Sequence, residues 1–349
     1  MSRLSNDSFA AHQNLLCERL YTCLANMHPL LRADVVLALQ QPGKMLYSAS
    51  AGNTEEVSPH SPPAGSWALL AFLVALCVQP DIQQPIASNV AVALECFICA
   101  LDLLDDVEDE DQTAIVSILG IPRTLNVATA LLACTQYFLL GLQHMGVESV
   151  VMQSLQTALQ VAMIEATSGQ HRDLLAEQRS VDELSLEECL EIATGKAGAL
   201  MRLACQLGAI VAEADEACLT LFSELGLLLG IAHQLDNDSH DLYDILQTPT
   251  VYEPCVTLEI GEQSRTTVFS SKTDVRRDKK TMPLVLAAKE TEQSLRNLET
   301  AAYRSALNQG ILSTWGIGLL YRERAKECLQ KIALLRPIPP LLPLLLGLS

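Results

Sequence analysis

Apolar residues recur at helical spacing along nearly the whole chain, and Leu, Ala, Gln and Glu dominate its long segments. Strict alternation of apolar and polar residues, which is typical of strands, is not sustained over most of the sequence. Aromatic residues make up only 4%. The pattern therefore predicts an all-α fold. The predicted helices cover residues 8–40, 67–79, 84–111, 124–145, 148–178, 184–213, 215–246, 281–309 and 314–335.

Two segments interrupt the helical pattern. Residues 48–66 are rich in Gly, Ser and Pro, and residues 247–274 carry Thr, Val and Pro with short strand-like pieces. Neither segment separates two different compositions, and no repeat of fixed period is evident. We therefore expect a single domain over residues 1–349, with its core at about 67–335 and a Pro/Leu-rich tail at 336–349 that packs across a groove or a partner subunit.

Composition narrows the class of protein. The 349 residues are 49% hydrophobic and 18% charged, which is ample for a large buried core. A formal net charge of −18 would repel nucleic-acid phosphates, so no nucleic-acid partner is expected. The apolar run at 67–78 is too short to span a bilayer, and prolines interrupt the tail, so no membrane span is expected. Eleven scattered cysteines and no recognisable secretory signal fit a cytoplasmic protein.

A first acidic cluster ends the predicted helix at 84–111. Residues 94–111 read LECFICALDLLDDVEDED, and on a helical wheel Asp102, Asp105, Asp106 and Asp109 share one face. Carboxylates near a helix C-terminus oppose the helix dipole and repel one another, so a cation should compensate them. Oxygen ligands at this spacing suit Mg²⁺. The alternative interpretation is an acidic face in contact with solvent.

A second polar cluster ends another apolar helix, at GLLLGIAHQLDNDSHDL (226–242). Gly226 and Gly230 would let another helix or a substrate chain approach closely. Two such clusters, each following buried apolar turns, indicate a paired clamp for metal ions and a diphosphate. One stripe of this second helix contains Gly230, Gln234, Asn237, Asp241 and Asp244.

These motifs resemble those of a known family. DDVED (105–109) is similar to the first Asp-rich motif of the trans-prenyl diphosphate synthases, and HQLDNDSHD (233–241) is similar to the second. The resemblance implies an all-α isoprenoid-synthase bundle around a deep apolar pocket, three Mg²⁺ ions and a homodimer. Further matches are Glu165, Gly169, Gln170 and Asp173 in EATSGQHRD, Gly195 and Lys196 in ATGKAGAL, and Asp274, Lys279, Thr281 and Pro283 in TDVRRDKKTMP.

The resemblance also implies roles for individual residues. Asp105 and Asp109 are expected to ligate two Mg²⁺ ions, with Asp106 in support. The third ion is expected at Asn237, Asp238 and Asp241. The residues expected to bind the substrate are Lys196, Lys279, Gln234, Gln170, Arg276, Arg277 and Lys44.

The sequence departs from the family where chain-elongating members bind isopentenyl diphosphate. Gly43 and Lys44 are present, but Met45 and Tyr47 stand where the family has arginines, and Ile98 stands where it has histidine. No Arg-Arg-Gly follows Asp109. Elongation with isopentenyl diphosphate is therefore disfavoured, because each lost charge-assisted hydrogen bond is worth about 1.5–3 kcal/mol. The replacement for a missing arginine is left open among Arg123, Arg172 and the basic run 276–280. Asn237, in place of the usual Asp, predicts weaker binding of the third ion.

The expected substrate is thus an allylic prenyl diphosphate that is ionised with release of pyrophosphate. The leading interpretation is a terpene synthase, in which the carbocation cyclises or is quenched. The alternatives are transfer of the prenyl group to another acceptor such as a peptide side chain or a small aromatic molecule, chain elongation with an altered acceptor site, and a non-catalytic regulatory subunit.

Overall fold

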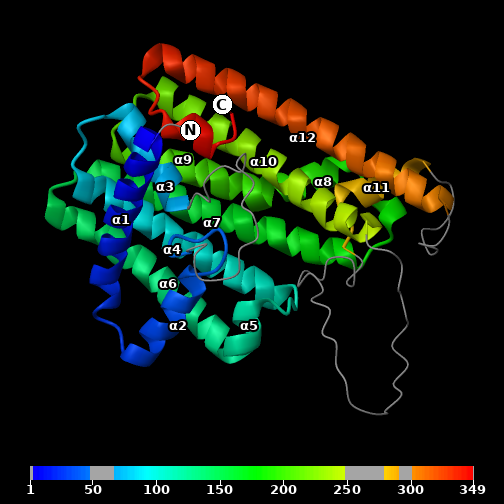
Figure 1. The fold of residues 1–349 in the computed structure, drawn as a ribbon, viewed down its shortest axis with the longest axis horizontal. Helices are drawn as coiled ribbons and strands as arrows, with labels where there is room; N and C mark the ends of the chain where they lie inside the picture. The colour runs from blue at the N-terminus through cyan, green and yellow to red at the C-terminus, as the bar shows by residue number, and fades with distance from the viewer. Residues whose placement is uncertain (1–2, 48–66, 248–278, 291–300, 349) are drawn as a thin grey trace.

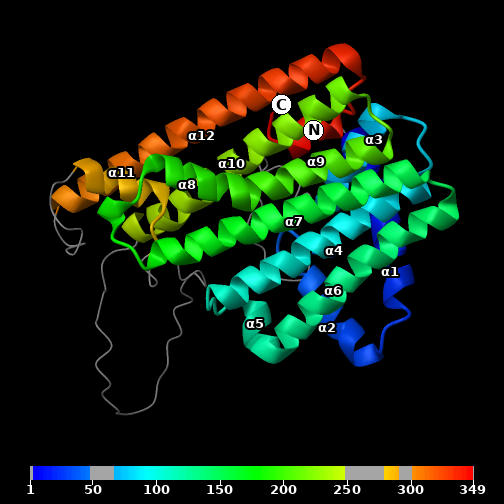
Figure 2. The same ribbon diagram turned by 180° about the vertical axis from the view of Figure 1, so that it is seen from behind.

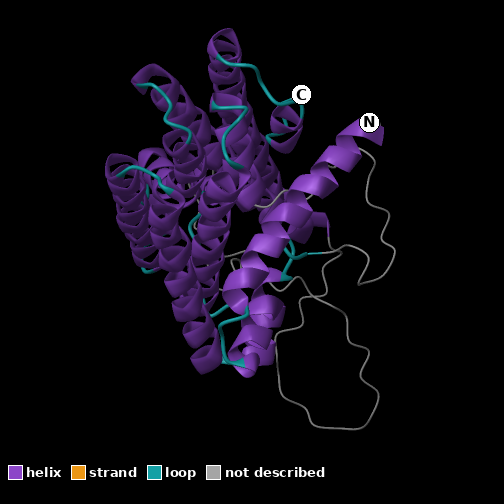
Figure 3. Cartoon of the chain, turned by 90° about the vertical axis from the view of Figure 1, so that its left-hand side faces the viewer, coloured by secondary structure: helices purple, strands orange, loops and turns teal. Residues whose placement is uncertain are grey.

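The computed structural model describes residues 3–47, 67–247, 279–290 and 301–348. Within these ranges the chain forms helices and no β-strand, which confirms the all-α prediction (Figures 1 and 3). The predicted loops at 48–66 and 247–274 lie almost entirely outside the described residues, as do Arg276 and Arg277.

The helices follow one another with short connections in most of the described chain. Their bounds are α1 Arg3–Leu24, α2 Pro29–Leu39, α3 Trp67–Val78, α4 Gln84–Glu108, α5 Ala114–Leu119, α6 Ile121–Gly141, α7 Ser149–Glu177, α8 Leu186–Ala193, α9 Ala199–Val211, α10 Glu216–Gln247, α11 Met282–Glu290, α12 Ala301–Leu335 and α13 Leu341–Leu345. A π-helical segment, η4 (Thr194–Gly198), joins α8 to α9, and short 3₁₀ turns occupy Leu142–Met145 and Val181–Glu183.

Long helices lie side by side in layers. α10 packs between α12 and α9, and α4 packs against α3, α6 and α9. Figures 1 and 2 show α12 along one long edge of the molecule, with α10, α9, α7, α4 and α6 following in turn. The C-terminal halves of α4, α7 and α10 line one cavity in this layered arrangement, so both acidic clusters lie at the same site.

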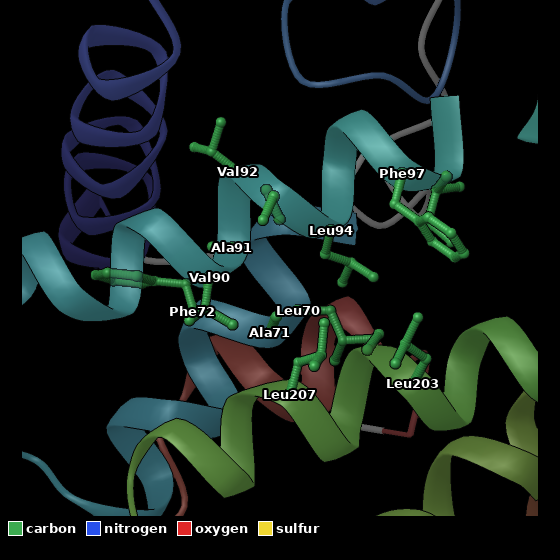
Figure 4. Packing of buried hydrophobic residues seen from close by; sticks show 14 of the residues in the cluster. Leu70, Ala71, Phe72, Val90, Ala91, Val92, Leu94, Phe97, Leu203 and Leu207 are labelled. Atoms are coloured by element: carbon green, nitrogen blue, oxygen red, sulfur yellow. The ribbon is translucent and has the colours of Figure 1, made fainter. Parts of the chain in front are cut away.

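The largest apolar core surrounds α3. This helix is apolar at every position, and such a helix is stable only when it is covered on all sides. Leu70 and Phe72 of α3 pack with Val90 and Leu94 of α4 and with Leu203 of α9 in one buried cluster (Figure 4). The C-terminal tail closes this cluster, because α13 packs on α3 and buries Leu342.

Within the described ranges, three stretches are long and apolar enough to cross a membrane by length and composition: Gln84–Glu108, Ile121–Met145 and Glu216–His240. In the first of them, 89% of the most apolar window is buried inside the fold. Burial in the protein core therefore accounts for the hydrophobicity of Gln84–Glu108. The absence of a membrane span stays a prediction, as do the single domain and the homodimer.

Several predicted boundaries were wrong. The helix expected at 8–40 is broken between α1 and α2, where His28 caps α2 and Pro29 occupies its first turn. The helix expected at 184–213 is interrupted by η4. The break expected between 309 and 314 does not exist, because α12 runs through Gly310, whose lack of a side chain allows contact with the carbonyl oxygen of Pro283. α5 was not predicted.

Candidate active site

One cavity of about 760 Å³ opens between the C-terminal half of α4, α7, η4 and α10. Ten of the thirteen candidate site residues line it, namely Asp105, Asp106, Asp109, Asn237, Asp238, Lys196, Lys279, Gln234, Gln170 and Lys44. The side chain of Asp241, which lies in α10, and the whole of Arg276 and Arg277 are outside the described part of the chain. The apolar part of the lining includes Leu101, Leu104, Ile115, Leu174 and Leu200.

The first acidic cluster faces this cavity along one side of α4. Asp102, Asp105, Asp106 and Asp109 all line it, so the helical-wheel prediction of a shared face is confirmed. Asp109 is 2% exposed, while the side chain of Asp105 is 40% exposed. The acidic face thus lines a cavity, in which Asp109 is buried while Asp102 and Asp105 remain in contact with solvent.

Two lysines from distant parts of the chain lie against these carboxylates. Lys196 Nζ is 3.4 Å from Asp105 Oδ1 and 2.8 Å from Asp173 Oδ2. Lys279 Nζ is 2.5 Å from Asp109 Oδ2 and 3.9 Å from Asp173. Asp173 thus lies between the two ammonium groups. Lys279 is only 7% exposed, so its ammonium is buried among these carboxylates.

The π-helical segment brings Lys196 into the cavity. A π turn holds one residue more than an α turn, so it rotates the side chains that follow it. The segment can lie this close to α7 only because both contact positions are glycine: a Cβ on Gly169 would lie 2.7 Å from the carbonyl carbon of Gly195 and 2.8 Å from the backbone nitrogen of Lys196. The backbone of Lys196 is therefore packed directly on α7.

The second cluster faces the first from α10. Gln234 Nε2 donates a hydrogen bond of 2.9 Å to Asp238 Oδ1, and Asn237 Nδ2 lies 3.4 Å from His233 Nε2. The predicted close approach at the two glycines of this helix is confirmed, because a Cβ on Gly226 would lie 2.5 Å from the carbonyl oxygen of Met201 and one on Gly230 would lie 2.3 Å from that of Ala197 in η4. The polar half of α10 is thereby held against η4 and α9.

Burial and the lysines act on the carboxylates in opposite directions. Burial raises the pKa of Asp105, and it raises the pKa of Asp106 to about 6 although Thr113 donates a hydrogen bond of 3.0 Å to it. At Asp109 burial is outweighed by Lys279, which lowers the pKa of that carboxyl. Asp109 is therefore the most readily ionised of the three, and it carries the lysine contact.

The donor set fits a hydrated Mg²⁺ ion. Among the described residues no three His, Cys, Asp or Glu side chains form a metal cage by themselves. Mg²⁺ does not need such a cage, because it commonly binds through one or two carboxylates, waters and substrate phosphate oxygens. Gln170 Nε2 donates a hydrogen bond of 2.9 Å to Asp109, while its buried Oε1 has no hydrogen-bond partner among the described residues. A metal-bound water would be a suitable donor for this oxygen.

The positions where the family has its acceptor arginines and histidine are not part of the described cavity wall. Met45 and Ile98 are buried in the main core, and Tyr47 is exposed. Two replacements considered from sequence lie elsewhere: Arg123 binds Asp34, and Arg172 binds Glu191. No arginine of the described chain lines the cavity, whose described cations are Lys44, Lys196 and Lys279.

Two lining residues had no role in the sequence analysis. Asp102 was placed on the acidic face, but its contact with Lys44 was not predicted. Trp67, at the start of α3, lines the cavity beside residues 41–44. No pattern in the sequence signals either contact, since both join segments that are far apart along the chain. Asp173 belongs to a motif that resembles the family, but the sequence alone predicts no role for its side chain, which contacts Lys196 and Lys279 in the structure.

Comparison with known proteins shows the family. Residues 67–250 match the model of the polyprenyl synthetase family, and this chain belongs to that family. It is 31% identical over 176 residues to geranylgeranyl diphosphate synthase of Mycobacterium tuberculosis, covering 49% of this chain and 48% of the relative. It is also 31% identical over 154 residues to the tryptophan prenyltransferase ComQ of Bacillus spizizenii, covering 44% and 50%. The matched stretches thus span about half the length of these relatives.

Solved structures share the fold over almost the whole chain. The geranylgeranyl pyrophosphate synthetase of Geoglobus acetivorans aligns with a TM-score of 0.69 at 19% identity, covering 100% of this chain and 98% of that one. The polyprenyl synthetase of Streptomyces coelicolor A3(2) aligns with a TM-score of 0.67 at 21% identity, covering 97% and 96%. The chain therefore has the all-α fold of these synthases, in agreement with its membership of the polyprenyl synthetase family.

Proposed function

We propose that this enzyme is a magnesium-dependent prenyltransferase that ionises an allylic prenyl diphosphate and transfers the prenyl group to an acceptor without a diphosphate. The observation that carries the proposal is the distribution of cations in the cavity. Lys196 and Lys279 face the acidic motifs, where a leaving diphosphate would bind. Another part of the lining, formed by residues 41–44 and Trp67 and here called the acceptor end, has Lys44 as its described cation and no described arginine.

The residues of the cavity support ionisation of the donor. Bound Mg²⁺ would neutralise the charge that develops on the leaving pyrophosphate as the carbon–oxygen bond breaks. Asp105 and Asp109 would hold the first ions, and Asn237, Asp238 and Asp241 a third. Lys196 and Lys279 would bind the phosphate oxygens as point charges. The apolar lining, such as Leu104 and Ile115, would exclude water from the prenyl cation.

The comparisons favour transfer over the cyclisation expected from the sequence. The matching relatives include a geranylgeranyl diphosphate synthase and a tryptophan prenyltransferase; the second name describes transfer of a prenyl group, and neither name describes cyclisation. The charge-poor acceptor end argues against isopentenyl diphosphate as that acceptor. An uncharged nucleophile, such as the indole of a tryptophan side chain, needs no cation in this position.

A product assay tests the proposal. The purified protein is incubated with Mg²⁺ and geranyl, farnesyl or geranylgeranyl diphosphate, with labelled isopentenyl diphosphate or with tryptophan-containing peptides, and pyrophosphate and products are measured. We expect pyrophosphate release with one of the allylic substrates and a peptide mass increased by one prenyl group. Incorporation of label into longer prenyl diphosphates would contradict the proposal, and a cyclic hydrocarbon formed without an acceptor would restore the terpene-synthase interpretation.

A further inference from the structure

The charge of Lys44 is already bound within the protein. Its ammonium donates a hydrogen bond to Oδ2 of Asp102. Among the described residues, Asp102 is the carboxylate that lies within ion-pair distance of this ammonium. The side chain of Lys44 is 11% exposed and that of Asp102 is 47% exposed, so the carboxylate, more than the ammonium, is presented to the cavity. Asp102 lies three residues before Asp105, nearly one turn away on the same face of α4.

A second carboxylate of α4 holds the backbone beside Lys44. Glu95 is fully buried, and its Oε1 accepts a hydrogen bond of 2.7 Å from the backbone N–H of Met45. Its Oε2 accepts one of 3.0 Å from the N–H of Ala68, next to Trp67. Glu95 and Asp102 are seven residues apart, which is two turns of the helix, so they lie along one side of α4. Lys44 is thus fixed at two points: Glu95 holds the backbone of the next residue, and Asp102 holds its ammonium.

The rest of the cavity offers an incoming anion no free cation among the described residues. Seven carboxylates and three lysines line it in this part of the chain. Lys196 is paired with Asp105 and Asp173, and Lys279 with Asp109. A second diphosphate at the acceptor end would have to displace Asp102 from Lys44 and would then lie beside an uncompensated carboxylate. The diphosphate and the carboxylate of Asp102 are both negative and would repel each other, more strongly in a partly buried site than in water.

We propose that Asp102 is a selectivity residue that excludes diphosphate-bearing acceptors, by neutralising Lys44 and placing a carboxylate at the acceptor end. This inference rests on the proposed function and names the property of the acceptor that the site selects, which is the absence of negative charge. It differs from the loss of the family's arginines, since it assigns the exclusion to a group that is present and can be removed.

A binding measurement tests the inference independently of turnover. Labelled isopentenyl diphosphate is titrated by equilibrium dialysis with Mg²⁺ and a saturating unreactive farnesyl thiolodiphosphate, which fills the donor site. The proteins compared are the wild type, Asp102→Ala, Asp102→Asn and the double variant Asp102→Ala with Lys44→Met. The matched control is Asp34→Ala, which removes a carboxylate from an ion pair with Arg123 away from the cavity. Thermal melts verify that each variant is folded.

We expect Asp102→Ala to bind isopentenyl diphosphate about tenfold or more tightly than the wild type, because the freed ammonium gains a charge-assisted contact. Asp102→Asn should show a smaller gain, and Lys44→Met should abolish the gain in the double variant. Asp34→Ala should behave as the wild type. Unchanged binding in both Asp102 variants, or the same gain in Asp34→Ala, would overturn the inference while leaving transfer to a neutral acceptor intact. Elongation by the wild type would instead overturn the proposed function.

Discussion

Lys279 Nζ lies 2.5 Å from Asp109 Oδ2, in a buried ion pair between residues 170 positions apart in the sequence. The pair joins Lys279, in the segment that precedes α11, to Asp109, the C-cap of α4. Metal ions and phosphate oxygens are natural competitors for these two partners, since the ions seek the carboxylate and the phosphates seek the ammonium. Substrate binding is therefore expected to replace the contact between Lys279 and Asp109 by two new contacts, one between Asp109 and a metal ion and one between Lys279 and a phosphate oxygen.

The two metal-site aspartates should differ in their effect on stability. Asp105→Ala should abolish pyrophosphate release and leave the melting temperature nearly unchanged, because the side chain is 40% exposed. Asp109→Ala should also abolish release and cost about 3–5 kcal/mol of stability, since it leaves the buried ammonium of Lys279 without its nearest partner. Turnover assays and chemical denaturation check both results. Retained turnover in either variant would remove these residues from the metal site.

Lys279 should contribute to diphosphate binding. Lys279→Met should raise the Michaelis constant for the allylic diphosphate about tenfold or more and weaken inhibition by added pyrophosphate, because one charge-assisted contact is lost. Lys289→Met is the matched control, since Lys289 is exposed on α11 nearby. Steady-state kinetics at several pyrophosphate concentrations separate the two effects. Equal values for Lys279→Met and the control would mean that Lys279 pairs with Asp109 but does not contribute to diphosphate binding.

The glycine contact between α7 and η4 should be essential. Gly169→Ala would place a Cβ 2.8 Å from the backbone nitrogen of Lys196, so η4 must move away and carry the lysine with it. We expect a loss of about 1–3 kcal/mol of stability and weaker binding of the allylic diphosphate. Gly316→Ala serves as control, because Gly316 is exposed in α12 with nothing within 4 Å of its added Cβ, and it should stabilise the helix by about 1 kcal/mol. Wild-type affinity in Gly169→Ala would show that the position of Lys196 does not depend on this contact.

Asn237→Asp should be tolerated and should lower the Mg²⁺ concentration that gives half-maximal turnover. The substitution adds one negative charge at the position where the third ion is proposed, without changing the size of the side chain. Activity measured over a magnesium titration tests this expectation. A folded but inactive variant would mean that the amide nitrogen, which lies 3.4 Å from His233 Nε2, is needed as a donor.

Asp106 should make stability depend on pH. Burial raises its pKa from the ordinary value of 3.8 to about 6 in the folded protein, so ionisation disfavours the folded state. The stability contributed by the protonated carboxyl is fully present below pH 4 and is lost as the pH rises through 6. In magnesium-free buffer, Asp106→Asn should therefore melt higher than the wild type at pH 7.5 and at the same temperature at pH 3.5. A difference that does not vary between these two pH values would contradict the assignment.

The sequence predicted those parts of the site that depend on a single helix. The spacing of Asp102, Asp105 and Asp109 decides which face they share, and helix geometry is regular enough to carry that inference. Lys279 could be placed only through the family resemblance, because a 170-residue separation leaves no local signal for its contact with Asp109. The interruption of the helix at 184–213 was missed because one extra residue in a turn hardly alters the spacing of apolar positions. The sequence feature that accompanies this interruption is Gly195, which packs on Gly169.

The pairing of Lys44 with Asp102 was missed for a different reason. The sequence alone predicts Lys44 as a substrate-binding residue whose ammonium is available to the ligand. A neighbour supplied by another helix decides whether that charge is free, and such a neighbour is fixed by tertiary packing.

The two hydrogen bonds of Glu95 have a consequence for how this chain can be altered. They fasten the backbone at Met45 and at Ala68 to one side chain of α4, so a single buried carboxylate joins two segments that are separate in the sequence. Replacing Glu95 with its amide would therefore disturb the backbone beside Lys44 and the backbone beside Trp67 at once, because an amide has one acceptor oxygen for these two N–H groups.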